Sequence, residues 1–285
     1  MPSFIKKHPI VITIVMALLL FIIAFSSLQP SNDKAFLPQF EKQPIVDING
    51  DIITINNLRD FRYQASFTGG DNIIEARYIE RQYKLSEVKQ LWYGISHFAE
   101  HGFAHVFLSF EFSDGQFLVV SVEARLEQQH SDGYHPLKGL LRQYQKTLVL
   151  ATEEDVIGLR THIRKEQLYL YPVTLSQLRL KALLLNHLRS SEDLLDNPSF
   201  YNTFSDNCMT GLLKVTSTLN HWWQWLDYRI ILPGYSDQLL FQYEEDQQHS
   251  KLDFTAWQQQ HLINPAHSTI DSPRFSLDIR EPNKD

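Results

Sequence analysis

The sequence predicts an α+β domain, an antiparallel β-sheet packed with helices, attached to a membrane by one N-terminal helix. Three observations predict it: an uncharged apolar run near the N-terminus, stretches in which apolar and polar residues alternate, and amphipathic segments between them. The 285 residues are 43% hydrophobic and 21% charged, an ordinary globular composition that excludes a disordered or low-complexity protein. The formal net charge of −7 and the lack of a basic run or zinc-finger spacing exclude a nucleic-acid-binding protein.

The first element is the uncharged run Pro9–Phe25, which lies just behind Lys6 and Lys7. Basic residues at this flank keep the N-terminus in the cytoplasm. The run is about 17 to 20 residues long, close to the length that spans a bilayer core, and its exit lacks a clear signal-peptidase site. We therefore favour an uncleaved anchor over a cleaved signal peptide in residues 1–28. Either one places the remaining chain outside the cytoplasm, facing a periplasm where the cell has one.

Composition then divides the chain. Residues 29–46 contain three prolines and little periodicity, so they are expected to be a linker. The folded domain is expected over 47–245. Residues 246–285 are rich in Gln, His and Pro, lack periodicity, and are expected to form a partly disordered tail.

Within the domain, residue patterns predict strands and helices in a definite order. Alternation around an Asn-Gly turn predicts a hairpin at the start, and strict alternation on both sides of Ser113–Gly115 predicts the most definite hairpin. N-cap residues and amphipathic spacing mark the helices. The expected strands are 45–63 with its turn, 72–85, 104–112, 116–125, 147–151 and 167–173, and the expected helices are 86–102, 153–165, 175–191 and 208–233.

The chain has a single cysteine, Cys208, which excludes an internal disulfide and a cysteine-based metal site. Three N-cap residue types precede it, so it is expected in the first turn of its helix. Unpaired N–H groups and the helix dipole at that position stabilise a thiolate, lower the thiol pKa and can hold an oxyanion. Cys208 is therefore a candidate nucleophile. The alternative is a buried, inert thiol.

A nucleophilic cysteine needs an imidazole to accept its proton and a third polar group to orient that imidazole. His105 is the candidate base, because it is the one histidine inside a strongly predicted strand. If the hairpin loop is the three-residue Ser113–Gly115, Glu123 lies directly opposite His105 and can orient it. A two-residue turn would instead point Glu123 to the other face, so the strand register decides this assignment.

At these residues the chain resembles a known family. The motifs that carry the resemblance include NLRDFRY (57–63), AHVFLSFEF (104–112), SVEAR (121–125), LYLYPV (168–173), FYNTFSDNCMTGLL (200–213) and LPGYSDQLL (232–240). Together, over about residues 47–245, they look like signatures of the Lnb N-terminal periplasmic domain family of bacterial membrane-associated proteins. That family is similar to the circularly permuted papain-like, or lecithin:retinol acyltransferase-like, cysteine hydrolases.

The resemblance implies a permuted papain-like fold, with Cys208 as nucleophile, His105 as base and Glu123 as orienting residue. It also implies that Asn207 shapes the turn before Cys208 or assists the oxyanion. The chemistry would be hydrolysis or acyl transfer at an amide or ester of an envelope peptide, peptidoglycan or lipid, without a cofactor or metal. The protein would be anchored in the bacterial inner membrane by its N-terminal helix, with the main domain in the periplasm.

Two alternatives remain open. The segment 97–101 reads His-Phe-Ala-Glu-His, which matches the HxxEH zinc-hydrolase pattern if it lies on a helix. Gly102 would end that helix at once, so an exposed polar helix end explains the segment more simply. The second alternative is a non-catalytic envelope protein that uses a papain-like fold to bind or organise a partner.

Overall fold

The computed structural model describes residues 9–66, 71–100, 102–130, 133–216, 221–248 and 253–281. The large sheet has the strand order β1-β2-β9-β8-β7-β6-β10, with β5 also paired to β2. All its pairings are antiparallel except a single parallel bridge between β2 and β9. The predicted α+β class with an antiparallel sheet is therefore confirmed.

The strands of this sheet are β1 (Ile45–Asn49), β2 (Ile52–Arg59), β5 (Tyr78–Lys84), β6 (Val88–His97), β7 (Ala104–Phe112), β8 (Phe117–Arg125), β9 (Gln145–Ala151) and β10 (Gln167–Val173). A separate hairpin is formed by β3 (Arg62–Ala65) and β4 (Asp71–Glu75). The helices are α2 (Pro9–Ser27), α3 (Pro38–Glu41), α4 (Pro136–Leu140), α5 (Glu153–Gly158), α6 (Gln177–Asp196), α7 (Cys208–Lys214), α8 (Tyr228–Ile231), α9 (Asp237–Gln248), α10 (Phe254–Gln260) and α11 (Phe275–Asp278). A π-helical turn (Leu159–Ile163) follows α5, and short 3-10 turns complete the chain.

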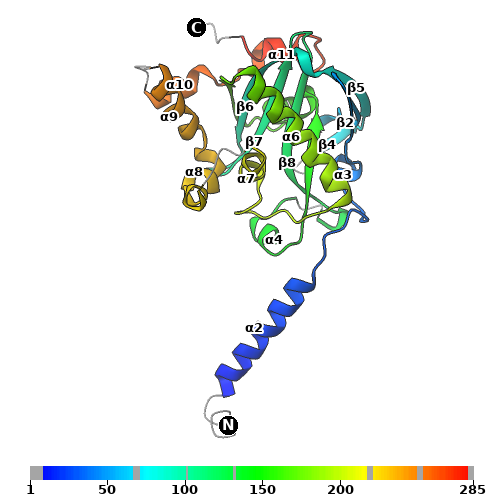
Figure 1. The fold of residues 1–285 in the computed structure, drawn as a ribbon, viewed down its shortest axis with the longest axis vertical. Helices are drawn as coiled ribbons and strands as arrows, with labels where there is room; N and C mark the ends of the chain where they lie inside the picture. Colours follow the sequence, from blue (N-terminus) through cyan, green and yellow to red (C-terminus); the bar gives the residue numbers. More distant parts are fainter. Residues whose placement is uncertain are drawn as a thin grey trace.

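Alternation along the strands buries both faces of the sheet. On β7, Ala104, Val106 and Leu108 face a core that includes α6 and α7. The next residues along, such as Phe107, face a second core that includes α5, α11 and the segment before β1. Figure 1 shows α6 crossing one face of the sheet, while α2 projects away from the domain.

The predicted helix over 86–102 is wrong, because residues 88–97 form strand β6 between β7 and β10. Val88, Leu91 and Ile95 have helical spacing, and all three are buried in the sheet core. A helix was expected because Ser86 is an N-cap type and Gly102 a helix-ending type. Residues 88–97 form a strand because β7 and β10 pair with it on both sides. The absence of a side chain at Gly94 leaves room for the Phe107 ring.

The last predicted helix is also shorter than expected. Helix α7 ends at Lys214 rather than continuing to residue 233, and a 3-10 turn (Trp222–Leu226) and α8 follow, with residues 217–220 outside the described part. The β-branched pair Val215 and Thr216 disfavours further helix.

Both terminal segments pack against the domain more closely than their composition indicated. In the expected linker 29–46, Phe36 and Phe40 are buried and the Asn32 amide donates to the carbonyls of Leu194 and Leu195 at the end of α6. In the expected tail 246–285, Trp257 and Phe275 are buried. Single aromatic residues at irregular spacing pack these segments against the domain, and a search for periodic apolar positions does not detect such residues.

Candidate active site

The candidate residues lie where two neighbouring strands separate. β7 and β8 pair with each other only from Leu108 to Glu111 and from Phe117 to Val120. Beyond that point β7 continues alongside β6, and β8 continues alongside β9. We call the diverging ends, residues 104–107 of β7 and 121–125 of β8, the β7–β8 fork.

The hairpin turn sets the register of the fork. Gly115 adopts a left-handed φ of 84°, and the Phe112 amide donates to the Gln116 carbonyl across a three-residue loop. Leu108 therefore lies opposite Val120. This is the register in which Glu123 shares a face with His105, and the two-residue turn is excluded.

On that face, three side chains form a chain of hydrogen bonds. His105 Nε2 lies 2.8 Å from the Ser121 hydroxyl, which donates to Glu123 Oε1 at 3.1 Å. The direct distance from His105 Nε2 to Glu123 Oε1 is 3.7 Å. The structure thus brings His105 and Glu123 together through Ser121, a residue that the sequence analysis did not identify.

Helix α7 begins at Cys208 and packs against both strands of the fork. Asn207 is its N-cap: the side-chain Oδ1 accepts from the amides of Met209 and Thr210, both at 2.9 Å. The Thr210 hydroxyl accepts from the Asn207 amide at 2.8 Å, which completes a capping box. The expected start of the helix at Cys208 is therefore present, and Asn207 shapes the turn before it.

The environment of the sulfur differs from the expected one. Cys208 is buried, with Sγ 3.9 Å from the Ala104 carbonyl. Burial raises the pKa of the thiol to about 11, although the amides of Val106 and Met209 favour the thiolate. The expected lowering of the pKa is wrong for this state of the protein, because desolvation outweighs the effect of the helix terminus.

Burial has the opposite consequence for the imidazole. It lowers the pKa of His105 to about 3, with a further contribution from the nearby Arg160 guanidinium and partial opposition from Glu123. His105 is therefore neutral at physiological pH, as a general base must be.

Cys208 and His105 lie at the same fork but on opposite faces of β7. Cys208 belongs to the core that contains Ala104 and Val106, whereas the His105 ring stacks near Phe107 with 6.4 Å between ring centroids. Among the described residues, the hydrogen bonds of these two side chains go to other groups. The thiol thus contacts the β7 backbone at Ala104, whereas the imidazole projects from the other face of the strand and is hydrogen-bonded to Ser121.

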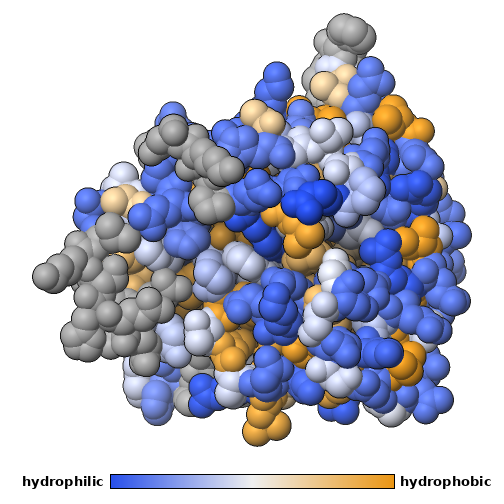
Figure 2. All heavy atoms as spheres, turned by 90° about the horizontal axis from the view of Figure 1, so that it is seen from above, coloured by the Kyte–Doolittle hydropathy of each residue, from blue (hydrophilic) through white to orange (hydrophobic). Residues whose placement is uncertain are grey.

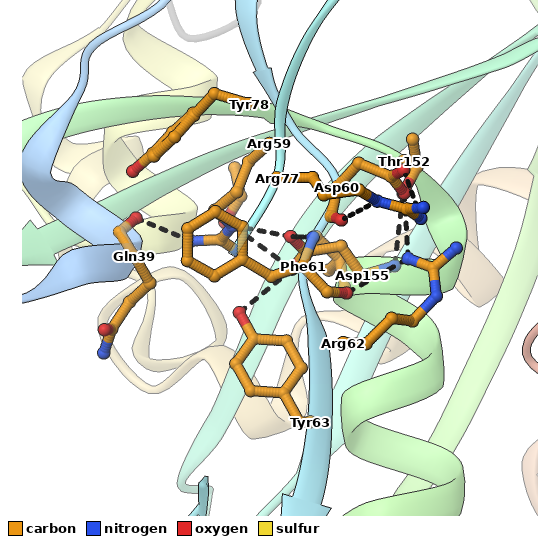
Figure 3. A network of polar contacts seen from close by, with 12 residues as sticks. Gln39, Arg59, Asp60, Phe61, Arg62, Tyr63, Arg77, Tyr78, Thr152 and Asp155 are labelled. Atoms are coloured by element: carbon orange, nitrogen blue, oxygen red, sulfur yellow. Dashed lines mark hydrogen bonds and ion pairs between the residues drawn. The ribbon is translucent and has the colours of Figure 1, made fainter. Parts of the chain in front are cut away.

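A buried ionic network joins Arg59 to Asp155 (Figure 3), and Arg59 also reaches Glu123. Arg59 lies 3.8 Å from the Glu123 carboxylate and 3.0 Å from that of Asp155. Asp155 also accepts from the Phe61 amide at 2.8 Å and from the Tyr63 hydroxyl at 3.3 Å. Burial opposes the charge on Arg59, but the carboxylates outweigh it and raise the Arg59 pKa. Arg59 stands in the quoted NLRDFRY segment and Asp155 in the helix expected over 153–165, yet nothing in their spacing indicated that they meet.

The structure contradicts the helix on which the zinc-site alternative depends. His97 ends strand β6 rather than lying on a helix, so the expected one-turn spacing of two histidines does not exist. Its ring makes an edge contact with Tyr169, and burial lowers its pKa. His101 lies outside the described residues, and the described residues contain no cluster of three or more His, Cys, Asp or Glu side chains suited to a metal.

A large apolar cavity of about 1150 Å³ adjoins α7. It lies among α6, α7 and α9, and its lining includes Tyr93, Leu183, Met209, Leu212, Trp223 and Leu240. Met209 and Leu212 belong to the helix that begins with Cys208, and the Tyr93 hydroxyl contacts Met209 Sδ at 3.5 Å. The cavity therefore begins one residue beyond the candidate nucleophile.

The fold defines a membrane-anchored α+β protein, with a span at Ile10–Ser27 that is not buried against the domain. Residues 75–234, which include His105, Glu123 and Cys208, match the Lnb N-terminal periplasmic domain family, and the chain belongs to this family. No curated protein and no solved structure matches it. The protein is thus a single-pass inner-membrane protein with a periplasmic domain, as the sequence predicted.

Proposed function

We propose that the protein is a cysteine-dependent hydrolase or acyltransferase of permuted papain-like type, acting on an amide or ester bond of an envelope substrate. Cys208 is the nucleophile, His105 the base, Glu123 the orienting group and Asn207 the residue that fixes the start of α7. The observation that carries the proposal is the arrangement at the β7–β8 fork. The chain His105–Ser121–Glu123 and the first residue of α7 meet at the same strand ends.

The proton positions support this assignment. Burial opposes ionisation of Glu123, but the guanidiniums of Arg59 and Arg160 and the hydrogen bond from Ser121 outweigh it and lower the Glu123 pKa. The carboxylate is therefore charged and only accepts hydrogen bonds. The single hydroxyl hydrogen of Ser121 is directed to Glu123. Ser121 must then accept from His105, so Nε2 carries the imidazole proton and Nδ1 holds the free lone pair. Nδ1 is thus the atom that takes the thiol proton.

The reaction requires Nδ1 of His105 to approach Cys208 Sγ. The His105 ring must then leave its present face of β7, and within the sheet only the pairing of residues 104–106 with β6 opposes this, because these residues lack a β8 partner. After the approach, the proton passes from Sγ to Nδ1 and the thiolate attacks the carbonyl carbon. The amine or alcohol leaves with that proton, and a thioester remains for water or an acceptor.

The oxyanion cannot use all the helix N–H groups that the sequence analysis considered. The amides of Met209 and Thr210 already donate to Asn207 Oδ1. The amide of Cys208 remains, and it donates to the hydroxyl of the buried Tyr201. An oxyanion would replace Tyr201 as the acceptor of this amide.

Among peptide, peptidoglycan and lipid, the cavity beside α7 favours a substrate with an acyl chain. Its lining is mostly aliphatic and aromatic, and polar sugar or peptide groups would lose their hydrogen bonds with water there. An acyl chain in this cavity would bring its carbonyl group toward Cys208 from the Met209 side.

The test is turnover of p-nitrophenyl acyl esters by the full-length protein in lipid nanodiscs. Cys208→Ala should abolish turnover, and His105→Gln should lower it by about 100-fold or more. His97→Gln, which changes a partly buried histidine outside the fork, should leave it unchanged. Longer acyl chains should lower KM. Turnover that survives Cys208→Ala would refute the proposal.

One observation favours a non-catalytic binding protein as the second candidate. Cys208 is buried with a raised pKa, and His105 lies on the other face of β7. If this candidate holds, the protein shows no turnover of the esters, and Cys208→Ala leaves its cellular function intact.

A further inference from the structure

Four large apolar or aromatic side chains are exposed together at one end of the domain. They come from α4, from its flanks and from the loop before α7. The members are Tyr134 (39% exposed), Leu137 (62%), Leu141 (42%) and Phe204 (52%). We call them the α4 patch. A cluster of exposed apolar residues that includes an aromatic ring marks an interaction surface rather than ordinary scatter.

Hydrogen bonds hold the two segments of the α4 patch together. The Thr203 hydroxyl, next to Phe204, donates to the Pro136 carbonyl at 2.7 Å. The Tyr134 hydroxyl lies 2.9 Å from the same Thr203 oxygen. The absence of a side chain at Gly139 allows Thr203 to pack directly on α4. The patch is thus a fixed surface that presents Phe204 and the leucines together.

The α4 patch is connected to the exit of the membrane helix. Arg142 directly follows Leu141, and its guanidinium donates to the Phe25 carbonyl at 3.3 Å and lies 4.5 Å from the centre of the Phe25 ring. Phe25 is in the last turn of α2, which ends at Ser27. Figure 1 shows α4 at the end of the domain nearest α2. The membrane surface must therefore pass close to the patch.

Where α2 meets the domain, polar groups and an arginine lie next to the exposed apolar residues of the α4 patch, the combination found at a bilayer interface. A mostly polar cavity of about 420 Å³ lies between the exit of α2 and the loop before α7, and Arg142, Asn202 and Ser205 are among its lining residues. The opposite end of the domain presents mainly hydrophilic side chains (Figure 2). Interfacial surfaces of membrane proteins combine aromatic and aliphatic contacts with arginine at the level of the headgroups.

We propose that the α4 patch inserts into the headgroup and upper acyl region of the membrane that α2 spans, so that the domain rests on the bilayer in one orientation. A second copy of the chain is a poorer occupant, because a stable protein interface uses about 20 to 30 residues a side and the patch offers four. The proposal concerns the resting surface of the domain and does not depend on the proposed catalytic function.

The single cysteine allows a direct test. In a Cys208→Ser background, Leu137→Cys or Phe204→Cys is labelled with a nitroxide, and the full-length protein is placed in nanodiscs of phosphatidylethanolamine and phosphatidylglycerol. Leu277→Cys on α11 is the control, since Leu277 is 45% exposed and α11 lies at the end of the domain opposite α2 (Figure 1). The readout is the collision rate of each label with oxygen, which concentrates in lipid, relative to a water-soluble nickel chelate.

The expected result is an oxygen-to-nickel ratio several times higher at positions 137 and 204 than at 277. Equal ratios at all three positions would overturn the proposal. Spectral broadening at 137 that disappears on dilution with unlabelled protein would also overturn it, because it would identify a second copy as the occupant. Circular dichroism of each labelled variant confirms that it is folded.

Discussion

Asp155→Asn tests the buried network that supports Glu123. Asp155 is fully buried, with a relative exposure of 0%, and its carboxylate accepts from Arg59 Nε at 3.0 and 3.2 Å and from the Phe61 amide at 2.8 Å. Asparagine keeps one acceptor oxygen but places an NH₂ group against a donor, and the Arg59 charge loses its closest partner.

The magnitude follows from leaving a buried cation without its partner, which costs about 3 to 5 kcal/mol. Glu123 lies 3.8 Å from Arg59 and still offsets part of that charge, so the expected loss is about 3 kcal/mol, at the lower end. For a domain of this size, about 3 kcal/mol corresponds to a fall in Tm of roughly 6 to 12 °C.

The assay is thermal and urea unfolding of the full-length protein in detergent micelles, followed by tryptophan fluorescence. Asp271→Asn is the matched control, because Asp271 pairs with Arg62 at 2.9 Å but its side chain is 80% exposed. That exposed pair should contribute less than about 1 kcal/mol. Equal, small effects of the two substitutions would refute the reasoning that Asp155 neutralises a buried charge.

Three further predictions follow from the site and the sheet. Because the thiol pKa of Cys208 is about 11, alkylation by iodoacetamide should accelerate with every pH increase up to pH 10, and a plateau below pH 9 would contradict the buried thiol. The pKa of His105 is about 3 when folded and about 6.5 when unfolded, so its contribution to stability is complete above pH 6.5 and is lost as pH falls toward 3. Between pH 7.5 and 4.5 urea unfolding should report a loss of about 2.7 kcal/mol that His105→Gln lacks, and identical pH dependence in both proteins would argue against a buried neutral imidazole. Gly94→Ala should destabilise by about 1 to 3 kcal/mol in urea unfolding because its methyl group meets the Phe107 ring, and Phe107→Leu should recover part of the loss; no recovery would assign the effect to the backbone instead.

The hairpin of β7 and β8 could be predicted because its signals are local. Strict alternation defined the strands, and Gly115 supplied the left-handed position that a three-residue loop requires. The N-cap at Asn207 was likewise readable from residue type. These features placed Cys208 at the start of its helix and reduced Glu123 to two possible registers, of which the structure shows the three-residue loop.

Other features depend on tertiary contacts and were not readable. The residues of β6 satisfy the helical period as well as the strand period, and only pairing with β7 and β10 decides between them. The raised pKa of Cys208 reflects burial by the sheet, whereas the sequence indicated only the helix terminus. Asp155 and Arg59 are far apart in the sequence, so their ion pair has no sequence signature.

The central claim is that Cys208 forms a covalent acyl intermediate with the help of His105. The direct measurement is rapid-quench mass spectrometry of the full-length protein mixed with a p-nitrophenyl acyl ester. The account predicts an acyl mass on the peptide that contains Cys208, labile to hydroxylamine as a thioester is, forming about 100-fold more slowly in His105→Gln. Acylation that occurs at other residues, or at Cys208 with the same rate in His105→Gln, would contradict it.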